Sequence, residues 1–516
     1  MIKTKLYIII KKLLLIYLFF FTGRFKFQNL SGLNFKIIDF NNYEKNKNLI
    51  FKKDFFQIEK NPVVYSYDFI NLCNKLGGKK GIEIAKIGIF KWYEINKFNT
   101  DIVWGSKQIA QRIINLIYNF DFINSISTKA DENKLKQILK ININAFNRFS
   151  FPNNIDQYSL LELKVYILIK YIIGEETGNI KNKFLAILEK QIDAFSMHKS
   201  YNIFEQAKFI NNINEIISML LNFKNEVPEI LSLTKIKMEA VLAQYFHKDG
   251  TVALFNGANN YNLDKIKLSL KEKQNIRKIQ YPNNNNGIFY FEDRQKKIFF
   301  DNVQPTNSIL SKKLSAGTLS IEFSSDKEKI ITNCGALEKN TGNAAYLRYS
   351  AAHSTIVLEN TNISEIRENQ PHIKFPQMVS VKKQQEANKH IIEASHNGYL
   401  KNYKKIVKRK IYFQENENYL MGVDSIISAT SKNKEVVFHI RFHILPNINI
   451  TKTNSKKSII LKTNKNMIWL FKSNKDLSLE ESVYIDKNDV KETKQIVIKS
   501  ITKKNREQIE WSLIKK

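Results

Sequence analysis

The stretch Gly317-Thr318-Leu319-Ser320-Ile321-Glu322-Phe323 decides how the second half of this sequence is interpreted, because its apolar residues recur at every second position. That period places successive side chains on opposite faces of a β-strand. Three more alternating or β-branched runs, bounded by Asn, Gly and Ser clusters, lie at 354–358, 408–413 and 436–442. Because no helical pattern separates these runs, the sequence predicts an antiparallel β-sandwich and not a βαβ sheet.

The residues that precede this region follow a different period. Between about residues 62 and 246, apolar side chains recur at spacings of three and four, which is typical of amphipathic helices. Short polar breaks at 77–80 and 174–178 predict antiparallel helical hairpins. The expected organisation is therefore an N-terminal segment over 1–60, a helical domain over 61–250 and a β domain over 251–516.

The charge of the chain points to a polyanionic partner. Of its 516 residues, 81 are Lys or Arg and 49 are Asp or Glu, which gives a net charge of +32. Nucleic acid, an anionic membrane surface and an acidic polysaccharide all fit such a charge. The chain is rich in Lys, Ile and Asn throughout, as AT-biased coding produces, so part of the charge has no functional meaning. No nucleic-acid-binding module is recognisable, and we expect no nucleic-acid partner.

Two further features concern the cysteines and the N-terminus. Cys73 and Cys334 are too few and too far apart for a disulfide framework or a cysteine zinc site. The basic start and the apolar run 13–21 resemble a signal peptide or a short anchor, although the run is shorter than the ~20 residues of a membrane span. An amphipathic or core helix is the alternative, and membrane-surface association through this segment stays open.

Several strings, in this order along the chain, resemble bacterial heparinase II/III-like proteins over roughly residues 60–515. No single string is sufficient, but the ordered set is specific. The first four are Trp104–Asn115, His247–Gly257, Ile331–Gly335 and Ala352–Thr355. Ser395–Tyr399 and Arg441–Pro446 look like sheet motifs of the same family.

This resemblance implies an α+β multidomain fold, in which an incomplete (α/α) toroid precedes an antiparallel β-sandwich. Active members of the family are polysaccharide lyases, which are carbon-oxygen lyases acting on uronic-acid polymers such as glycosaminoglycans (heparan sulfate) or alginate. An acidic polysaccharide is therefore the expected partner. Because such polymers lie outside the cell, the cell envelope or periplasm is the expected location, with a cytoplasmic or membrane-associated location as the alternative.

β-Elimination sets the requirements for the site. A donor such as Asn, His or Arg must neutralise the uronate carboxylate, and a Tyr or His must remove the C5 proton. The resemblance assigns the neutralising role first to Asn202 and second to His198, while a helix N-cap is the alternative for Asn202. The family's catalytic Tyr falls in Ala253–Gly257, which contains no Tyr. Tyr261 is the nearest phenol, and a packed loop aromatic is its alternative role.

The same resemblance addresses metal binding. Metal-containing relatives carry a His-rich strand start, an acidic residue before a Gly and a later His. The matching positions here are Lys312–Gly317, without His, then Asn333 and His353. One imidazole does not make a zinc site, so we predict no metal and no other cofactor. His353 is instead a candidate general base or charge neutraliser, or else a hydrogen-bonded sheet histidine.

Three residues are candidates for substrate binding. Arg348 is expected to hold a carboxylate or sulfate as a bidentate donor, with a solvated surface Arg as the alternative. Trp104 and Arg112 are two helical turns apart on one face and are candidates for a sugar cleft. A packed Trp capped by the Arg is the alternative for that pair.

Three functional hypotheses follow from the sequence. The first is a lyase that cleaves an acidic polysaccharide by β-elimination. The second is a catalytically degenerate protein that binds or helps to process an envelope polysaccharide, which the missing Tyr favours. The third is a hydrolase, which needs paired carboxylates, and Asp193 and Glu205 are the candidates near the key segment.

Overall fold

The structure is a computed structural model and describes residues 25–33, 62–98, 104–149, 159–261, 263–270, 287–337, 342–367, 370–431, 434–487 and 489–516. The chain divides into two compact units. The first comprises Met1–Gln191 and Lys208–Lys235, and the second comprises Ile192–Ala207 and Ile236–Lys516. The apolar run 13–21 and residues 271–286 lie outside the described residues.

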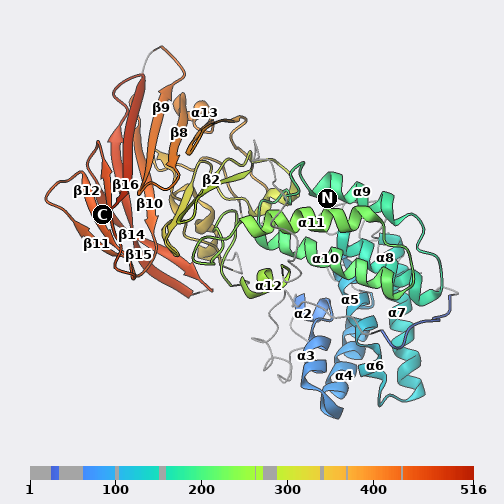
Figure 1. The fold of residues 1–516 in the computed structure, drawn as a ribbon. Helices are drawn as coiled ribbons and strands as arrows, with labels where there is room; N and C mark the ends of the chain where they lie inside the picture. The colour runs from blue at the N-terminus through green and yellow to red at the C-terminus, as the bar shows by residue number, and fades with distance from the viewer. Residues whose placement is uncertain are drawn as a thin grey trace. The chain divides into compact units, whose positions relative to one another are not determined.

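The first unit is helical, as its three-and-four periodicity predicts (Figure 1). In α9, for example, Ile180, Phe184, Ile187 and Gln191 are buried on one stripe. Asn179 caps this helix by accepting a hydrogen bond from the Asn182 N–H (3.0 Å). No helix among the described residues is both long and apolar enough to cross a membrane. The helices are α2 Pro62–Tyr65, α3 Phe69–Leu76, α4 Gly78–Asn96, α5 Ser106–Tyr118, α6 Phe120–Asn124, α7 Lys129–Phe149, α8 Ser159–Ile173 and α9 Ile180–Gln191.

The remaining helices either have residues in both units or belong to the second one. The helices α10 (Ile203–Asn222) and α11 (Glu229–Gln244) have residues in both units. The second unit also contains short helices. They are α12 Leu263–Leu268, η6 Ile309–Lys313, η7 Gly342–Arg348, η8 Ser350–Ala352 and α13 Leu400–Tyr403.

Strands of the second unit form two antiparallel sheets within the described residues, which confirms the predicted α+β class. The first sheet has the order β1 Ile288–Glu292, β2 Lys296–Asp301, β3 Ile321–Ser325, β4 Glu328–Thr332, β10 Val437–Ile444, β15 Asp489–Ile501 and β14 Ser478–Asp486, with β5 Ile356–Leu358 beside β10. The second has the order β11 Asn449–Lys452, β12 Ser458–Lys462, β13 Ile468–Ser473, β16 Arg506–Lys515, β9 Tyr419–Ser428, β8 Lys405–Gln414, β7 Lys389–His396 and β6 Val379–Glu386.

One hydrophobic core is common to both sheets. Along β8 every second residue is buried, which is the alternation expected of a strand with one face on a core. Phe442 of the first sheet packs its ring against Phe471 and Trp511 of the second, with centroids 4.9 and 4.8 Å apart. A buried ion pair between Arg409 and Asp424 lies behind this aromatic group. The core thus fixes the two sheets against each other.

The predicted strand at 317–323 begins later than its alternation suggests. Residues 317–320 form a turn that is closed by a hydrogen bond from the Ser320 N–H to the Gly317 carbonyl (2.8 Å). Leu319 adopts a positive φ of 65°, which no strand residue can have. Pairing starts at Ile321, so β3 places Glu322 inside the protein. This turn and Glu322 organise the candidate site.

Candidate functional site

Asn202 immediately precedes α10 (Ile203–Asn222) and caps its first turn. Its Oδ1 accepts hydrogen bonds from the Phe204 and Glu205 N–H groups (2.8 and 3.1 Å), which makes it the N-cap of the helix. Its Nδ2 donates to the carbonyl of Asn256 (2.8 Å), and the side chain is 1% exposed. Its second amide N–H has no partner among the residues that the structure describes. Asn202 is therefore held in a fixed orientation with one donor to spare.

His198 is held in the loop that precedes this cap. Its N–H donates to Gln206 Oε1 (2.7 Å), and its Nδ1 lies 2.7 Å from Ser200 Oγ. The Gln206 amide in turn donates to the carbonyls of Ser196 and Met238 (2.9 and 3.1 Å). These bonds fix the loop, so His198 and Asn202 belong to one rigid segment.

A buried acidic group lies beside the same loop. Asp193 Oδ1 accepts from the Phe195 and Met197 N–H groups (both 2.9 Å), yet burial keeps the pKa of this carboxyl above its usual value. Burial, and then the charge of Asp193, raise the pKa of the Tyr201 phenol. Asp301, at the end of β2, also acts on Tyr201, and burial raises its own pKa to about 7. Tyr201 therefore stays protonated next to carboxyl groups that ionise reluctantly.

The Asp301 carboxyl predicts a pH-dependent stability difference. Its folded pKa lies above its unfolded value, so wild-type stability falls as pH rises from about 4 through about 7. The Asp301→Asn variant has no ionisable group at this position, so this pH-dependent loss of stability disappears. Its amide oxygen can still accept the Val303 N–H, which lies 2.9 Å from the Asp301 oxygen in the wild type. We expect the variant to gain roughly 2–4 kcal/mol over the wild type between pH 4 and pH 8 in denaturant titrations. The exposed Asp476→Asn is the control, and an equally large gain at pH 4 contradicts the assignment.

The turn at Lys313–Gly317 connects the Asn202 segment to the other predicted residues. The Ser315 N–H donates to Asn256 Oδ1 (3.2 Å), and Asn256 also receives the Asn202 amide. Arg348 donates from Nε and Nη2 to the carbonyl of Leu314 (3.1 and 2.9 Å). The structure thus brings Asn202 and Arg348 to the same turn, although 146 residues separate them in the sequence.

His353 packs against the end of this turn. A Cβ atom at Gly317 would lie 3.0 Å from the His353 ring carbon Cγ, so the ring occupies the space that only glycine leaves. His353 is 2% exposed, and neither ring nitrogen makes a hydrogen bond of normal geometry. Burial lowers the pKa of His353 to about 4. The imidazole is therefore neutral, with a nitrogen lone pair available as a proton acceptor.

Glu322 is the centre of a buried hydrogen-bond network. One carboxylate oxygen contacts His247 Nε2 (2.8 Å) and Lys329 Nζ (3.2 Å), and the other accepts from the Asn333 N–H (2.9 Å). Asn333 Oδ1 accepts from the N–H of Ser354, whose Oγ accepts from the N–H of His443 (both 2.9 Å).

We call this group the Glu322 network. It joins strings from four places in the sequence, 247–257, 331–335, 352–355 and 441–446. Although burial opposes its ionisation, Lys329 and His247 hold the pKa of Glu322 at about 2. The carboxylate is therefore charged at neutral pH and fully compensated.

Tyr261 is not part of this network. It lies in a turn in which its N–H donates to Asn259 Oδ1 (3.0 Å). The neighbouring Asn260 donates to the Tyr484 hydroxyl (3.1 Å). Phe255, in the stretch where the resemblance expects a phenol, is buried with its ring 6.4 Å from that of Phe299. No described bond links Tyr261 to Asn202 or His353.

Trp104 and Arg112 lie in the first unit, where both are buried. The Arg112 guanidinium is 4.5 Å from the ring centroid of Trp92 and 4.8 Å from that of Trp104. Its Nε donates to Asn142 Oδ1 (2.8 Å), and Trp104 Nε1 donates to the carbonyl of Asn96 (3.0 Å). This packing favours the alternative role of the pair, which is to stabilise the helices.

The residues at the family's metal positions do not suit a metal. Asn333 uses its amide on Glu322 (3.3 Å) and Ser354, so it offers no free ligand atom. Within the described ranges, no group of three or more His, Cys, Asp or Glu side chains is placed to hold a metal ion.

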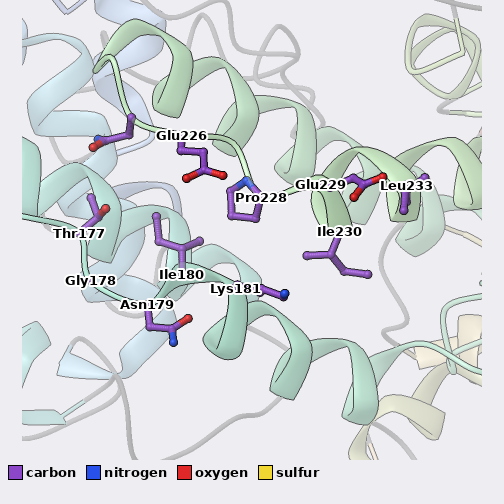
Figure 2. A pocket seen from close by; sticks show the side chains of 11 residues that line it. Thr177, Gly178, Asn179, Ile180, Lys181, Glu226, Pro228, Glu229, Ile230 and Leu233 are labelled. Atoms are coloured by element: carbon purple, nitrogen blue, oxygen red, sulfur yellow. The ribbon is translucent and has the colours of Figure 1, made fainter.

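A separate cavity of about 690 Å³ lies in the first unit, where α9 and α11 begin (Figure 2). Figure 2 shows Lys181 and Glu226 on its walls, together with the apolar Pro228 and Ile230. Glu226 and Glu229 are exposed, so solvent screens their charge. Nothing in this cavity resembles a reacting group.

Sequence reasoning missed several members of the candidate site. These are Glu322, Tyr201 and Asp301, whose partners include residues far away in the sequence, such as His247 for Glu322 and Tyr201 for Asp301. One signal was available, because Glu322 is a charged residue inside an otherwise apolar and small strand. Buried charges are rare unless they are paired, so such a residue indicates a polar network.

Comparisons with known proteins agree with this fold. Residues 283–512 match the family described as "Heparinase II/III-like, C-terminal". The crystal structure of heparinase III is 12% identical with a TM-score of 0.71, and the match covers 98% of this chain and 89% of that one. The heparan sulfate lyase HepC from Pedobacter heparinus is 13% identical with a TM-score of 0.61, covering 98% and 88%. No curated protein matches the sequence significantly.

Proposed function

This chain is heparinase II/III-like, and from this premise we propose that it cleaves an acidic, uronic-acid-containing polysaccharide by β-elimination. One observation carries the proposal. The Glu322 network links four of the strings on which the family resemblance rests, so these strings build one buried scaffold. The solved structures with this fold include a heparan sulfate lyase, which makes a uronate polymer the first substrate class to test.

Asn202 is the residue that we assign to the substrate carboxylate. Its cap and its bond to Asn256 fix the amide, and its second N–H is left to donate. A donor fixed before the substrate arrives stabilises the developing aci-carboxylate without a reorganisation cost. His198, in the same rigid segment, is the second choice for this role.

His353 is the residue that we assign to the C5 proton. Elimination transfers this proton to a base, the electron pair forms the C4–C5 double bond, and the C4–O bond breaks with protonation of the leaving oxygen. A neutral imidazole with a free nitrogen suits the first step. A bound polyanion would raise the low pKa of His353 toward neutrality. Tyr261, or the protonated Tyr201 beside Asn202, is the candidate donor to the leaving oxygen.

The same proposal includes the detailed architecture of the two units and the cellular location of the protein. We propose an incomplete (α/α) toroid for the helices and a β-sandwich for the two sheets, which share one core. We also propose Trp104 and Arg112 as stabilising residues, domain boundaries near residues 60 and 250, and a location in the cell envelope or periplasm. The N-terminal run 13–21 is the candidate for association with a membrane surface.

The alternative function is a catalytically degenerate protein that binds or helps to process an acidic polysaccharide. Two observations favour it. Phe255 stands in the stretch where the resemblance expects a phenol, and Asn202 already makes three hydrogen bonds. In this case the chain keeps the buried Glu322 network but no longer removes the C5 proton of the substrate.

An assay of the purified full-length chain with alginate and heparan sulfate separates the two functions. The lyase produces unsaturated uronates, which absorb in the ultraviolet, and His353→Gln is expected to slow their appearance at least about 100-fold. His390→Gln, whose imidazole pairs with Glu415, is the control and should retain the rate. Binding without absorbance supports the degenerate protein, and new reducing ends without absorbance support a hydrolase.

A further inference from the structure

The carbonyl of Leu314 is surrounded by more donors than it can satisfy. It receives Arg348 Nε (3.1 Å), Arg348 Nη2 (2.9 Å) and His372 Nε2 (2.9 Å), whereas a carbonyl oxygen has two lone pairs. The only other described acceptor for this guanidinium is the carbonyl of Arg367 (3.3 Å from Nη1). Because a guanidinium carries five N–H groups, donors exceed acceptors around Arg348.

Among the described residues, Arg348 has no carboxylate partner, unlike two other buried arginines of the second unit. Arg409 pairs with Asp424 (2.6 Å), and Arg441 pairs with Glu480 (2.9 Å). Arg348 is 4% exposed, and burial lowers its pKa to about 10. A buried cation without a counter-ion is costly, and an anionic ligand would relieve this cost.

His372 adds a second polar group at the same position. It is fully buried, and its Nε2 must carry the proton because it faces the Leu314 carbonyl. Its Nδ1 has no hydrogen-bond partner within the described ranges. The nearby charge of Arg348 helps to keep this imidazole neutral, after burial itself. When an anionic ligand accepts the N–H groups of Arg348, His372 Nε2 still donates to the Leu314 carbonyl.

The surroundings of this pair suit an acidic sugar. Tyr346 in η7 is 60% exposed, and its ring lies 5.2 Å from that of Tyr349, which is close enough to Arg348 to influence its pKa. Arg367 and Lys374 are largely exposed and share the single carboxylate of Glu365 (3.4 and 2.7 Å). Tyr346 thus lies on the same short helix as Arg348, and Arg367, whose carbonyl accepts from the Arg348 guanidinium, is one of two exposed cations that share one carboxylate.

We propose that Arg348 and His372 form a subsite for the carboxylate or sulfate of an acidic sugar, with Tyr346 as the surface on which the sugar ring packs. This inference rests on the proposed function for its substrate class. The planar guanidinium binds the anion through two parallel N–H groups, and the phenol contacts the pyranose face. The subsite fixes which sugar unit reaches the rest of the site.

Binding of defined oligosaccharides to the full chain tests this subsite. Alginate oligomers supply carboxylates only, heparan sulfate oligomers supply both anions, and a neutral dextran oligomer is the blank. We expect Arg348→Gln and Arg348→Lys to weaken binding of the acidic ligands about 30-fold, because both lose the paired donors. Tyr346→Ala, which changes an exposed residue, should weaken it about 5-fold or more. Arg506→Gln, an exposed loss of the same charge, should change it less than 2-fold.

The outcomes separate the subsite from the proposed function. Weakened binding of both acidic oligomers supports the subsite for either anion, and weakening only with heparan sulfate assigns it to sulfate. Wild-type affinity in the Arg348 variants and in Tyr346→Ala overturns the subsite, even if the chain cleaves uronates. If the wild-type chain cleaves neither polymer but these variants still lose binding, the subsite is supported and the lyase function is rejected.

Discussion

Replacing Glu322 with alanine is expected to lower the free energy of unfolding by about 3–5 kcal/mol, the largest stability effect that this structure predicts. The carboxylate is fully buried and compensates Lys329 (3.2 Å), while it also holds His247 and the N–H groups of Leu254 and Asn333. Its removal leaves a buried cation and several donors unsatisfied. Chemical denaturation followed by circular dichroism measures the change.

Glu480→Ala provides the matched control for this change. Glu480 also pairs with a cation, Arg441 (2.9 Å), but its side chain is 41% exposed, so the pair is worth at most about 1 kcal/mol. A loss below about 1 kcal/mol in Glu322→Ala would contradict the role of Glu322 as the centre of the network. Glu322→Gln, which keeps the shape, should lie between the two.

Asn202→Ser is expected to reduce elimination at least about 100-fold while costing about 1 kcal/mol or less of stability. Serine preserves the N-cap for the Phe204 and Glu205 N–H groups but supplies no amide donor. Initial rates of unsaturated product formation, with unfolding curves in parallel, separate catalysis from folding.

The control for Asn202→Ser is Asn179→Ser, which changes the N-cap of α9 in the same way (3.0 Å to the Asn182 N–H). This variant should retain the wild-type rate. If Asn202→Ser cleaves as fast as the wild type, Asn202 is a helix cap only. The donor to the substrate carboxylate must then come from elsewhere, and the His198 imidazole becomes the first candidate.

The class of the fold followed from periodicity, because a period of two or of about 3.6 is a local property. The alternation at 408–413 predicted a strand, which the structure contains as β8, and the spacing of three and four between about 62 and 246 predicted helices such as α5 and α9. The start of the stretch at 317 failed this test. Its alternation is real, but the local hydrogen bond from the Ser320 N–H to the Gly317 carbonyl closes a turn there. Within this turn Leu319 has a positive φ, and its N–H donates to the distant Asp301 carbonyl (2.8 Å).

The candidate site was less predictable, because its contacts are between residues far apart. The residue type of Asn202 suggested both a cap and a donor, and the structure contains the cap. The spacing of Trp104 and Arg112 put them on one helix face, but only tertiary packing reveals that this face is buried. His372 could not be found from the sequence, since its partner Leu314 lies 58 residues earlier.

The central claim is that this chain cleaves an acidic polysaccharide by elimination, and mass spectrometry of the fragments tests it most directly. Elimination leaves an unsaturated sugar at each new non-reducing end, so each such fragment is one water lighter than the corresponding hydrolysis fragment. We predict fragments of the lighter mass from alginate or heparan sulfate with the wild type and their loss in His353→Gln. Fragments of the heavier mass, or intact polymer with both substrates, would contradict the claim.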